Sequence, residues 1–490
     1  MARQVDVTAA AALADHAEIA HLAPAVQQLR SEAEAVVRRL RGRTVWMLNS
    51  TAAGGGVAEM LPTMVALLRD LGIATKWAVI ESEDDAFFHL TKRIHNLIHG
   101  SGQAGLSAED RTLFERVNAE NAQALLPLVE DGDFLAVHDP QPMPLAGMLK
   151  RERRVRAVWR CHIGLDQDTA ETRDAWRFLE PYGAAYDYGV FSAPEYIAPF
   201  LAGRSTMIYP AIDPLTHKNR HLHIHAVVGI LSNAGLVGRV GPVVRPPFED
   251  QAQRLNGNGR FASARAPEDI GLLHRPIITQ ISRWDRLKGF LPLLQGFAEF
   301  KRRCHAGELP PMGELHDRRR ALVRLVLAGP DPDSVADDPE GQVVIEELAA
   351  AYRELPAEIQ ADIAVVALPM RVPAENALMV NALQRASTIV VQNSLREGFG
   401  LTITEAMWKR VPVLTNSMAV GPRQQIRDNL DGRLLQDPTD RTALADALDA
   451  MLADSAGRSA WGRNAQRRAH DHFLVYAQLR GWLRLLNDLA

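Results

Sequence analysis

Two series of short apolar runs, separated by helical or loop stretches, constrain the fold of this chain more than any other feature. The first series comprises Thr44–Leu48, Lys76–Ile80, Phe134–Val137, Val155–Trp159, Gly189–Phe191 and Thr206–Ile208. The second comprises Pro276–Ile281, Leu325–Ala328, Ile363–Ala367, Thr388–Val391 and Val413–Leu414. Strands that alternate with helices are typical of parallel sheets that bind ligands at the carboxyl ends of their strands. We therefore predict an α/β protein with two Rossmann-like domains.

The length of the chain agrees with two domains, because a single core stops growing near ~250–300 residues and this chain has 490. We place the first domain at residues 1–212 and the second at 273–470. Residues 213–272 are predicted to form a linker and an insertion. Gly241–Pro247 is rich in proline, and Leu255–Arg265 is rich in Gly, Asn, Arg and Ala, which is typical of loops.

Charge and composition argue against several classes of protein. A net charge of −4 argues against nucleic-acid binding, which usually needs a basic excess. The first forty residues lack the pattern of a signal peptide, and no apolar run approaches the ~18 residues of a membrane span. With only two cysteines, a disulfide framework is not expected. We expect a soluble, cytoplasmic protein with no membrane partner.

The sharpest motif is Arg396–Met407, which follows the run Thr388–Val391 and opens a predicted helix. Gly398 and Gly400 free backbone amides to converge, and the helix N-terminus adds partial positive charge, so the turn suits a phosphate or another anion. Glu397 and Glu405 flank the turn and are predicted to face the same ligand. The alternative is structural, since Thr402 and Glu405 also fit a capping box.

Two cations follow the first strand of the second domain. Arg283 and Lys288 lie just beyond Pro276–Ile281, where a doubly wound sheet binds ligands. An arginine fork and a lysine point charge there can neutralise a diphosphate. The alternative is a solvated basic loop.

Polar residues also follow strands of the first domain. Gly54–Gly56 permit a close approach of backbone to ligand, but Glu59 stands where a dinucleotide fingerprint needs its third glycine, which disfavours a nicotinamide dehydrogenase. His138-Asp139-Pro-Gln141 and Arg160-Cys-His162 follow later strands. His162 and Asp139 are candidates to contact sugar hydroxyls, or they are structural hydrogen-bonding groups.

Three histidines, His221, His223 and His225, alternate with Leu222 and Ile224 and would share one face of a strand. No carboxylate or cysteine framework accompanies them, so metal binding is disfavoured. The chain also lacks a Walker A loop and a Gly-x-Ser-x-Gly elbow, which argues against P-loop kinases and α/β-hydrolases.

The segment Glu397-Gly-Phe-Gly-Leu-x-x-x-Glu405, with Arg283 and Lys288, resembles retaining glycosyltransferases of family 4. These have the GT-B fold, two Rossmann-like domains facing a cleft. A narrower resemblance, to trehalose glycosyltransferring synthases, covers roughly residues 40–220 and 272–440. It rests on Asn49–Glu59, His138–Gln141, Trp159–Ile163, Ile212–Leu215 with Lys218-Asn219, and Leu383–Ser387.

The resemblance implies roles for matching residues. Arg283 and Lys288 would hold the donor diphosphate, Glu397 the donor sugar and Glu405 the ribose, while His162 would line the transferring sugar. Of these, Glu397, Arg283, Lys288 and His162 form the expected catalytic set. Further donor contacts are expected from Gly55, Gly56, Gly398, Phe399, Gly400 and Leu401. Acceptor contacts are expected from Asp139, Gln141 and Arg160.

The resemblance also implies a nucleotide-glucose donor, free glucose as acceptor and trehalose as product, with no metal or other cofactor required. The C-terminal helix, within residues 471–490, is expected to pack back on the first domain. Two departures concern the acceptor side: Ala419–Arg423 replaces a frequent Gly-Gly pair, and residues 216–270 are long for a link. Another small sugar or polyol acceptor, a nucleotide-sugar epimerase and a non-catalytic GT-B binding protein remain as alternatives. The nucleotide and the oligomeric state, a homodimer included, stay open.

Overall fold

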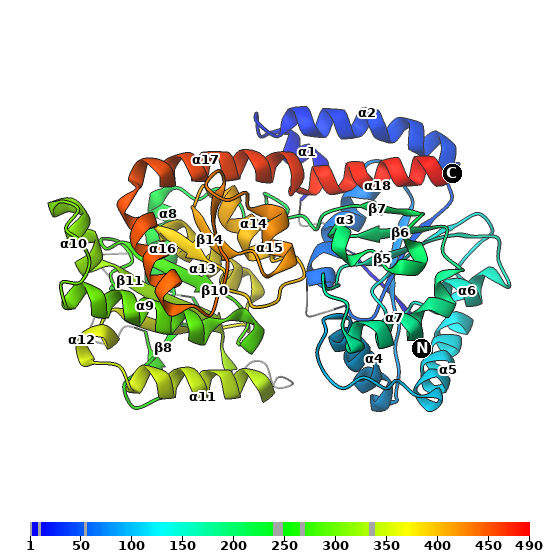
Figure 1. Cartoon of the computed structure of the whole chain (residues 1–490). Coiled ribbons are helices and arrows are strands. Elements are labelled where there is room, and N and C mark those ends of the chain that lie inside the picture. Colours follow the sequence, from blue (N-terminus) through cyan, green and yellow to red (C-terminus); the bar gives the residue numbers. More distant parts are fainter. Residues whose placement is uncertain (1, 8–10, 53–55, 239–247, 265–269, 333–338) are drawn as a thin grey trace. The chain divides into compact units, whose positions relative to one another are not determined.

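A computed structural model describes residues 2–7, 11–52, 56–238, 248–264, 270–332 and 339–490. The chain divides into two compact units. Unit 1 comprises Met1–Asp213 and His472–Ala490, and unit 2 comprises Pro214–Asp471. Each unit contains one sheet with helices on both faces (Figure 1), so the predicted α/β fold class is confirmed.

Unit 1 is built on a seven-stranded sheet in the order β1-β3-β2-β4-β5-β6-β7. All neighbours pair in parallel except β1, which runs antiparallel to β3 at the edge. The strands are β1 (Arg3–Val5), β2 (Val45–Asn49), β3 (Thr75–Val79), β4 (Phe134–His138), β5 (Arg156–Cys161), β6 (Tyr188–Phe191) and β7 (Ser205–Met207). Every residue of β2 and β4 is buried, as expected for parallel strands covered on both faces.

Helices connect these strands. They are α1 (Leu13–Ala17), α2 (Ala23–Leu40), α3 (Gly56–Asp70), α4 (Asp85–Ile98), α5 (Ala108–Leu125), α6 (Leu145–Lys150) and α7 (Ala170–Gly183), with 3₁₀ turns η1 (Pro194–Tyr196) and η2 (Pro199–Leu201). The start of α5 shows why it begins where it does. The Ser107 hydroxyl oxygen accepts a hydrogen bond from the amide of Asp110, and the Asp110 carboxylate accepts one from the amide of Ser107. The two bonds form a capping box.

Unit 2 has an eight-stranded sheet in the order β15-β14-β13-β10-β11-β12-β8-β9. Its parallel strands are β10 (Ile277–Ile281), β11 (Arg324–Pro330), β12 (Ile363–Leu368), β13 (Ile389–Val391), β14 (Val413–Asn416) and β15 (Gly432–Leu435). Side chains alternate between two cores: Ile278 and Leu325 belong to one, and Ile277 and Val326 to the other. This alternation follows from the two-residue period of a strand.

The helices of unit 2 cover both cores. They are α8 (Ile224–Asn233), α9 (Phe290–His305), α10 (Glu314–Leu322), α11 (Pro339–Arg353), α12 (Ala357–Gln360), α13 (Pro373–Ala386), α14 (Leu401–Trp408), α15 (Val420–Gln425), α16 (Arg441–Ala453) and α17 (Ser455–His472), with the 3₁₀ turn η3 (Arg286–Lys288). Helices α9, α11 and α16 contribute to one core, and α8 and α13 contribute to the other.

The structure differs from the linker and insertion expected at residues 213–272. The described residues between Pro214 and Leu272 belong to unit 2. Helix α8 buries Val227 and Leu231 in one core. The hairpin of β8 (Gln253–Leu255) and β9 (Phe261–Ser263) extends the sheet, because β8 pairs antiparallel with β12. Strands of three residues next to a Gly- and Asn-rich turn carry too little pattern to be recognised in the sequence.

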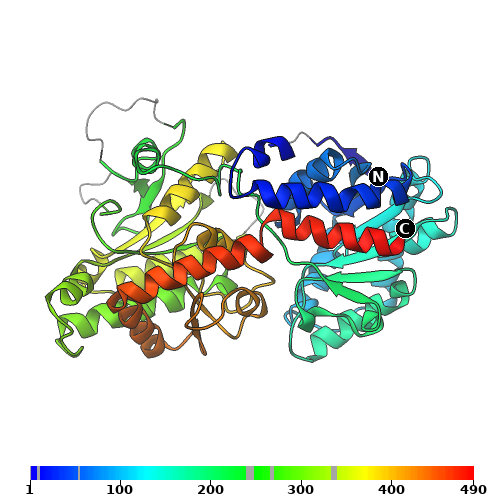
Figure 2. The same ribbon diagram turned by 90° about the horizontal axis from the view of Figure 1, so that it is seen from above.

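The C-terminal helix α18 (Val475–Leu489) belongs to unit 1 and packs on α2. Figures 1 and 2 both show the two helices side by side. Its buried residues include Val475, Leu479, Trp482 and Leu486, a spacing that places them on one helix face. Tyr476 adds a polar contact, with its hydroxyl 2.6 Å from Nδ1 of the buried His16.

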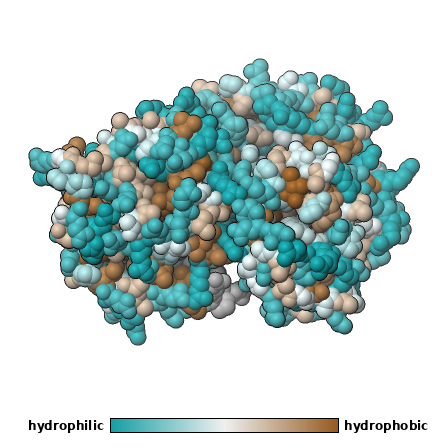
Figure 3. Space-filling model, in the orientation of Figure 1, coloured by the Kyte–Doolittle hydropathy of each residue, from teal (hydrophilic) through white to brown (hydrophobic). Residues whose placement is uncertain are grey.

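Among the described residues, no helix combines the length and the apolar character needed to cross a bilayer. The face of the molecule in Figure 3 is largely hydrophilic, with apolar residues scattered over it.

We predict that Leu479→Ala destabilises unit 1. Leu479 is fully buried on α18, and removing such a side chain leaves a cavity that costs about 2–5 kcal/mol. The matched control is Arg484→Ala on the same helix, where the side chain is exposed and a change within about 0.5 kcal/mol is expected. Thermal unfolding followed by circular dichroism measures both; equal midpoints would contradict the packing described for α18.

Candidate active site

The strand order of unit 2 reverses between β10 and β13. From β10 the chain proceeds to β11 and β12 on one side, then returns to β13, β14 and β15 on the other. Ligands of doubly wound sheets bind at such a switch point, beyond the carboxyl ends of the two strands. The segments that follow β10 and β13 meet there, because the amide of Leu395 donates to the carbonyl of Leu287 at 2.7 Å.

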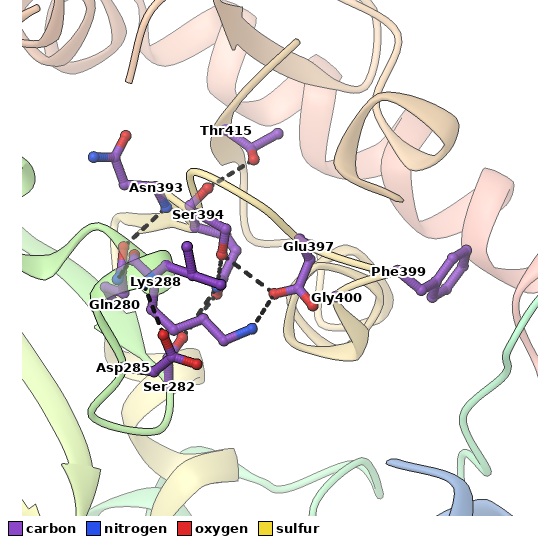
Figure 4. A network of polar contacts seen from close by, with 12 residues as sticks. Gln280, Ser282, Asp285, Lys288, Asn393, Ser394, Glu397, Phe399, Gly400 and Thr415 are labelled. Carbon is purple, nitrogen blue, oxygen red and sulfur yellow. Dashed lines mark hydrogen bonds and ion pairs between the residues drawn. The ribbon is translucent and has the colours of Figure 1, made fainter. Parts of the chain in front are cut away.

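The structure brings two of the predicted catalytic residues together at this point. The Lys288 ammonium lies 2.7 Å from Glu397 Oε2, and both side chains are about one-seventh exposed. The Ser394 hydroxyl donates to the same oxygen at 3.2 Å. Figure 4 shows Lys288 extending toward the Glu397 carboxylate, whereas the ring of Phe399 points away from it. Arg283 lies one residue beyond Ser282 on the same segment, with an exposed side chain.

A buried glutamine holds the two segments in place. Gln280, near the end of β10, donates from Nε2 to the carbonyl of Lys288 at 2.7 Å and accepts at Oε1 from the amide of Asn393 at 2.9 Å. Asn393 in turn donates to the carbonyl of Gly289. Our sequence interpretation missed these supporting amides. A glutamine within the apolar run Ile277–Ile281 was the available signal.

The glycine turn begins α14 without a side-chain cap. The helix cap is Gly400, whose φ of 88° lies in the left-handed region that favours glycine. The capping-box alternative for Thr402 and Glu405 is therefore wrong. Gln425 of α15 supports the turn, donating to the carbonyls of Phe399 and Gly400 at 2.5 and 3.2 Å.

The segment that departs from the family pattern also touches this turn. A Cβ on Gly421 would lie 2.4 Å from the Cα of Phe399, so only glycine permits this approach of α15. Gly398 and Leu401 complete the turn, both partly exposed. The altered loop Ala419–Arg423 therefore lies against the predicted donor turn.

Glu405 lies in the second turn of α14 and is 6% exposed. Gln384 Nε2 donates to its Oε2 at 3.3 Å, and the Lys218 ammonium lies 3.9 Å from its Oε1. Gln384 is a further supporting amide, and it lies within the motif Leu383–Ser387 on which the resemblance rests.

In unit 1 the strand order reverses between β2 and β4. Of the glycines after β2, Gly56 is the first residue of α3, while Gly54 and Gly55 lie outside the described residues. His138 ends β4, and Arg160 is the penultimate residue of the neighbouring β5. The sequence-predicted residues of this unit therefore meet at the ends of adjacent strands.

Asp139 contacts both the backbone amide and the imidazole ring of His162. Its Oδ1 accepts a hydrogen bond from the His162 amide at 2.9 Å and lies 3.0 Å from Nδ1 of the ring. Burial alone would raise the pKa of Asp139, but the contacts with His162 lower it below its usual value. Burial lowers the pKa of His162, although Asp139 opposes the shift. A neutral ring that donates from Nδ1 to this carboxylate presents Nε2 as a hydrogen-bond acceptor.

A small pocket lies beside this pair. Its lining residues are Val57, Met60, Leu61, Met64, His138, Arg160, His162, Gln478 and Trp482. Within the described part of the chain, both ring nitrogens of His138 and both terminal nitrogens of Arg160 are buried without a hydrogen-bond partner. Burial lowers the pKa of His138 well below 6.5 and that of Arg160 to about 10. An unpartnered buried polar group is costly, and the cavity, about 10 Å³, has room for about one water molecule.

Gln141 and two residues of helix α18 add to the polar and lining groups of unit 1. The carbonyl of Gln141 accepts from Asn118, and its side-chain Oε1 is also buried without a partner among the described residues. Helix α18 contributes Gln478 and Trp482 to the pocket wall. Sequence reasoning could not place these last two residues, because they follow the other lining residues by more than 300 positions.

The alternating histidines do not lie on a strand. His223 precedes α8 as its cap, and His225 is inside the helix. No cluster of three or more His, Cys, Asp or Glu side chains suited to a metal ion is found in the described ranges.

Comparison with known proteins matches each unit to a family model and the whole chain to trehalose synthases. Residues 47–198 match the family model "Trehalose synthase, N-terminal domain", and residues 268–468 match "Glycosyl transferases group 1". The chain is 32% identical to trehalose synthase of Pyrococcus horikoshii, covering 95% of this chain and 94% of that one. It is 32% identical to trehalose synthase of Rubrobacter xylanophilus, with 98% and 97% covered. A solved α,α-trehalose 6-phosphate synthase from Burkholderia multivorans has the same fold, with a TM-score of 0.64 at 17% identity, covering 91% of this chain and 97% of that one.

We predict that acid weakens the folded state through His138. Burial holds the pKa of His138 below 6.5 in the folded chain. As the pH falls below 6.5, the imidazole is therefore protonated in the unfolded chain before it is protonated in the folded chain. The free energy of unfolding should then decrease, by up to about 1.4 kcal/mol per pH unit for one such group. In His138→Gln this decrease should be shallower between pH 6.5 and 5. Denaturant unfolding at several pH values measures it, with the exposed His305→Gln as control; identical slopes in all three proteins would refute the prediction.

Proposed function

Because the chain belongs to the trehalose synthase family of glycosyltransferases with the GT-B fold, we propose that it transfers glucose from a nucleotide-glucose donor to free glucose, with retention of configuration, and so forms trehalose. The observation that carries this proposal is the contact of Lys288 with Glu397 at the switch point of unit 2. A cation and a carboxylate meet there beside a helix N-terminus, which suits a ligand that combines a diphosphate with a sugar.

We assign the donor to unit 2. Lys288 and Arg283 would neutralise the diphosphate, and the amides that begin α14 would add hydrogen bonds to it. Glu397 would accept hydrogen bonds from hydroxyls of the donor glucose, and Glu405 from the ribose. Charge that grows on the departing diphosphate is stabilised more in the transition state than in the ground state, which is the condition for catalysis. This scheme needs no metal ion.

We assign the acceptor side to unit 1. His162 is a neutral imidazole fixed by an ionised Asp139. Such a ring can accept a hydrogen bond from a sugar hydroxyl without competing for the phosphate. Gln141 and Arg160 have buried polar atoms without partners among the described residues, and hydroxyl groups of a ligand could bond them.

In the proposed step, the anomeric hydroxyl of the acceptor attacks C1 of the donor glucose from the side of the leaving group. The bond between C1 and the diphosphate oxygen breaks, and a phosphate oxygen takes the acceptor proton. Glu397 is already engaged by Lys288 and Ser394. This supports a role for Glu397 in binding the sugar and argues against a role as a covalent nucleophile.

Glu397→Gln should fold normally and lose at least about tenfold in transfer rate. The substitution replaces a charged acceptor, whose hydrogen bonds are worth roughly 1.5–3 kcal/mol each, by a neutral amide. Initial rates of nucleotide release with saturating glucose measure the effect. The control is Glu354→Gln, at an exposed position just after the end of α11, which should keep the wild-type rate. Full activity in a folded Glu397→Gln protein would remove Glu397 from the site.

The chemical structure of the product identifies the acceptor. Incubation with several nucleotide-glucoses and free glucose, followed by NMR, should reveal a disaccharide with two α-anomeric carbons and no reducing end. A reducing disaccharide would contradict trehalose as the product. Transfer to another small sugar or polyol but not to glucose would also contradict it, and would fit the altered loop Ala419–Arg423. Conversion of the donor without any acceptor would instead indicate an epimerase.

A further inference from the structure

A second pocket of about 430 Å³ lies at the opposite edge of the unit 2 sheet. Its lining residues precede strands: Leu272, Leu273 and Arg275 precede β10, Arg385 and Ala386 precede β13, and Lys409 precedes β14. In parallel strands these positions share the amino-terminal edge, whereas Lys288 and Glu397 follow strands at the carboxyl edge. The volume falls within the ~300–1,000 Å³ typical of small-molecule sites.

The wall of this pocket combines apolar and cationic side chains. Leu222, Ile224 and Val227, at and before the start of α8, complete the lining, and none of the described lining residues is acidic. Ile224 is 66% exposed and Leu273 is 47% exposed, so apolar surface meets solvent at this site. The wall would therefore gain from an occupant with an apolar body.

Among the described residues, no carboxylate pairs with Arg385. Its guanidinium donates to Asn381 Oδ1 at 2.9 Å and to the carbonyl of Arg220 at 3.1 Å, both uncharged acceptors. Arg275 has a carboxylate at 3.9 Å, from Asp362. That carboxylate also lies 2.6 Å from the ammonium of Lys301, so it cannot serve Arg275 alone.

The segment that contains α8 carries no acidic residue. Residues 214–238, which contain α8, include Lys218, Arg220 and four histidines but no aspartate or glutamate. Burial is the main cause that lowers the pKa of His221, and the nearby charge of Arg385 lowers it further. The electrostatic field in this pocket therefore favours an anion.

One wall residue is connected to the predicted donor site. The ammonium of Lys409 donates to Gln384 Oε1 at 2.6 Å, and Gln384 Nε2 donates to Glu405 Oε2 at 3.3 Å. The remaining contacts of Lys409 are Asn219 Oδ1 and the carbonyl of Glu405, each at 3.3 Å. A single buried amide thus lies between the pocket wall and the carboxylate that we assign to the ribose.

We propose that this pocket binds a small organic anion that has an apolar body and one phosphate or carboxylate group. Occupation of the pocket then strengthens donor binding through Lys409, Gln384 and Glu405. The binding part is independent of the proposed function, and the coupling part rests on it. Burial lowers the pKa of Lys409 to about 7, and a nearby anion favours the charged form of an amine. The charged ammonium keeps Gln384 Oε1 engaged, which leaves Nε2 directed at Glu405.

Phenyl phosphate is the probe for the binding part, titrated into the full chain by calorimetry. We expect saturable binding that weakens with salt, and much weaker binding of phenol and of inorganic phosphate, which each lack one half of the probe. Leu273→Asp adds a negative charge at the exposed wall and should weaken binding about tenfold or more. Leu273→Asn, the uncharged control of similar shape, should change it less than about threefold.

Absence of saturable binding, or equal binding by the Leu273→Asp and Leu273→Asn proteins, would overturn the site. Inorganic phosphate binding as tightly as phenyl phosphate would overturn the requirement for an apolar body.

The coupling part is measured as the dissociation constant of the nucleotide-glucose with and without saturating phenyl phosphate. We expect saturating phenyl phosphate to tighten donor binding at least about threefold in the wild type. In Leu273→Asp, phenyl phosphate should leave donor binding unchanged. The same donor affinity with the pocket full and empty would overturn the effector role. A failure of the proposed function appears differently, as donor that binds but transfers no glucose, and leaves the phenyl phosphate result as it stands.

Discussion

The buried amide of Gln280 is the interaction on which the candidate site of unit 2 depends. Its two polar atoms bond backbone groups on different segments, the carbonyl of Lys288 and the amide of Asn393. Because Gln280 is fully buried, water cannot replace either partner, and leaving one unsatisfied would cost about 1–3 kcal/mol. The amide therefore fixes the separation of the segments that follow β10 and β13. At that separation Lys288 reaches Glu397.

The strands of the two sheets could be predicted because both faces of each sheet are covered. A strand such as β2, buried at every position, must be apolar throughout, and that run is visible in the sequence. The β8–β9 hairpin could not be predicted in this way. Its strands have three residues each, and β8 owes its place to pairing with β12, more than a hundred positions away. Edge strands of this kind depend on partners and not on local pattern.

The candidate site shows the same division. Glu397, Gly398 and Gly400 stand in one motif, so the sequence could point to them. The partner of Glu397 is 109 positions away in Lys288, and only the reversal of strand order between β10 and β13 brings the two together. The supporting amide of Gln425 belongs to no motif, because a buried amide can be supplied from any helix that packs nearby. Gln384 lies within the motif Leu383–Ser387, but its partner Glu405 is 21 positions away. Sequence reasoning therefore finds the groups that meet a ligand more readily than the groups that hold them.

The candidate residues of unit 2 include accessible cations, whereas the candidate histidines of unit 1 are buried and neutral. This difference fits the reaction proposed for the two units. At the switch point of unit 2 the cations Lys288 and Arg283 remain accessible to a ligand, Lys288 partly and Arg283 exposed, as a leaving group that gains negative charge requires. In unit 1, burial lowers the pKa of His138 and His162 and keeps both rings neutral near pH 7. Neutral imidazoles can order uncharged hydroxyls without attracting the diphosphate. Arg160 is the exception, a cation buried beside the two rings, and its electrostatic influence lowers the pKa of each of them. Its charge thus helps to keep the two histidines neutral, the state that the proposed uncharged acceptor would require, and this accounts for a buried arginine near the end of β5.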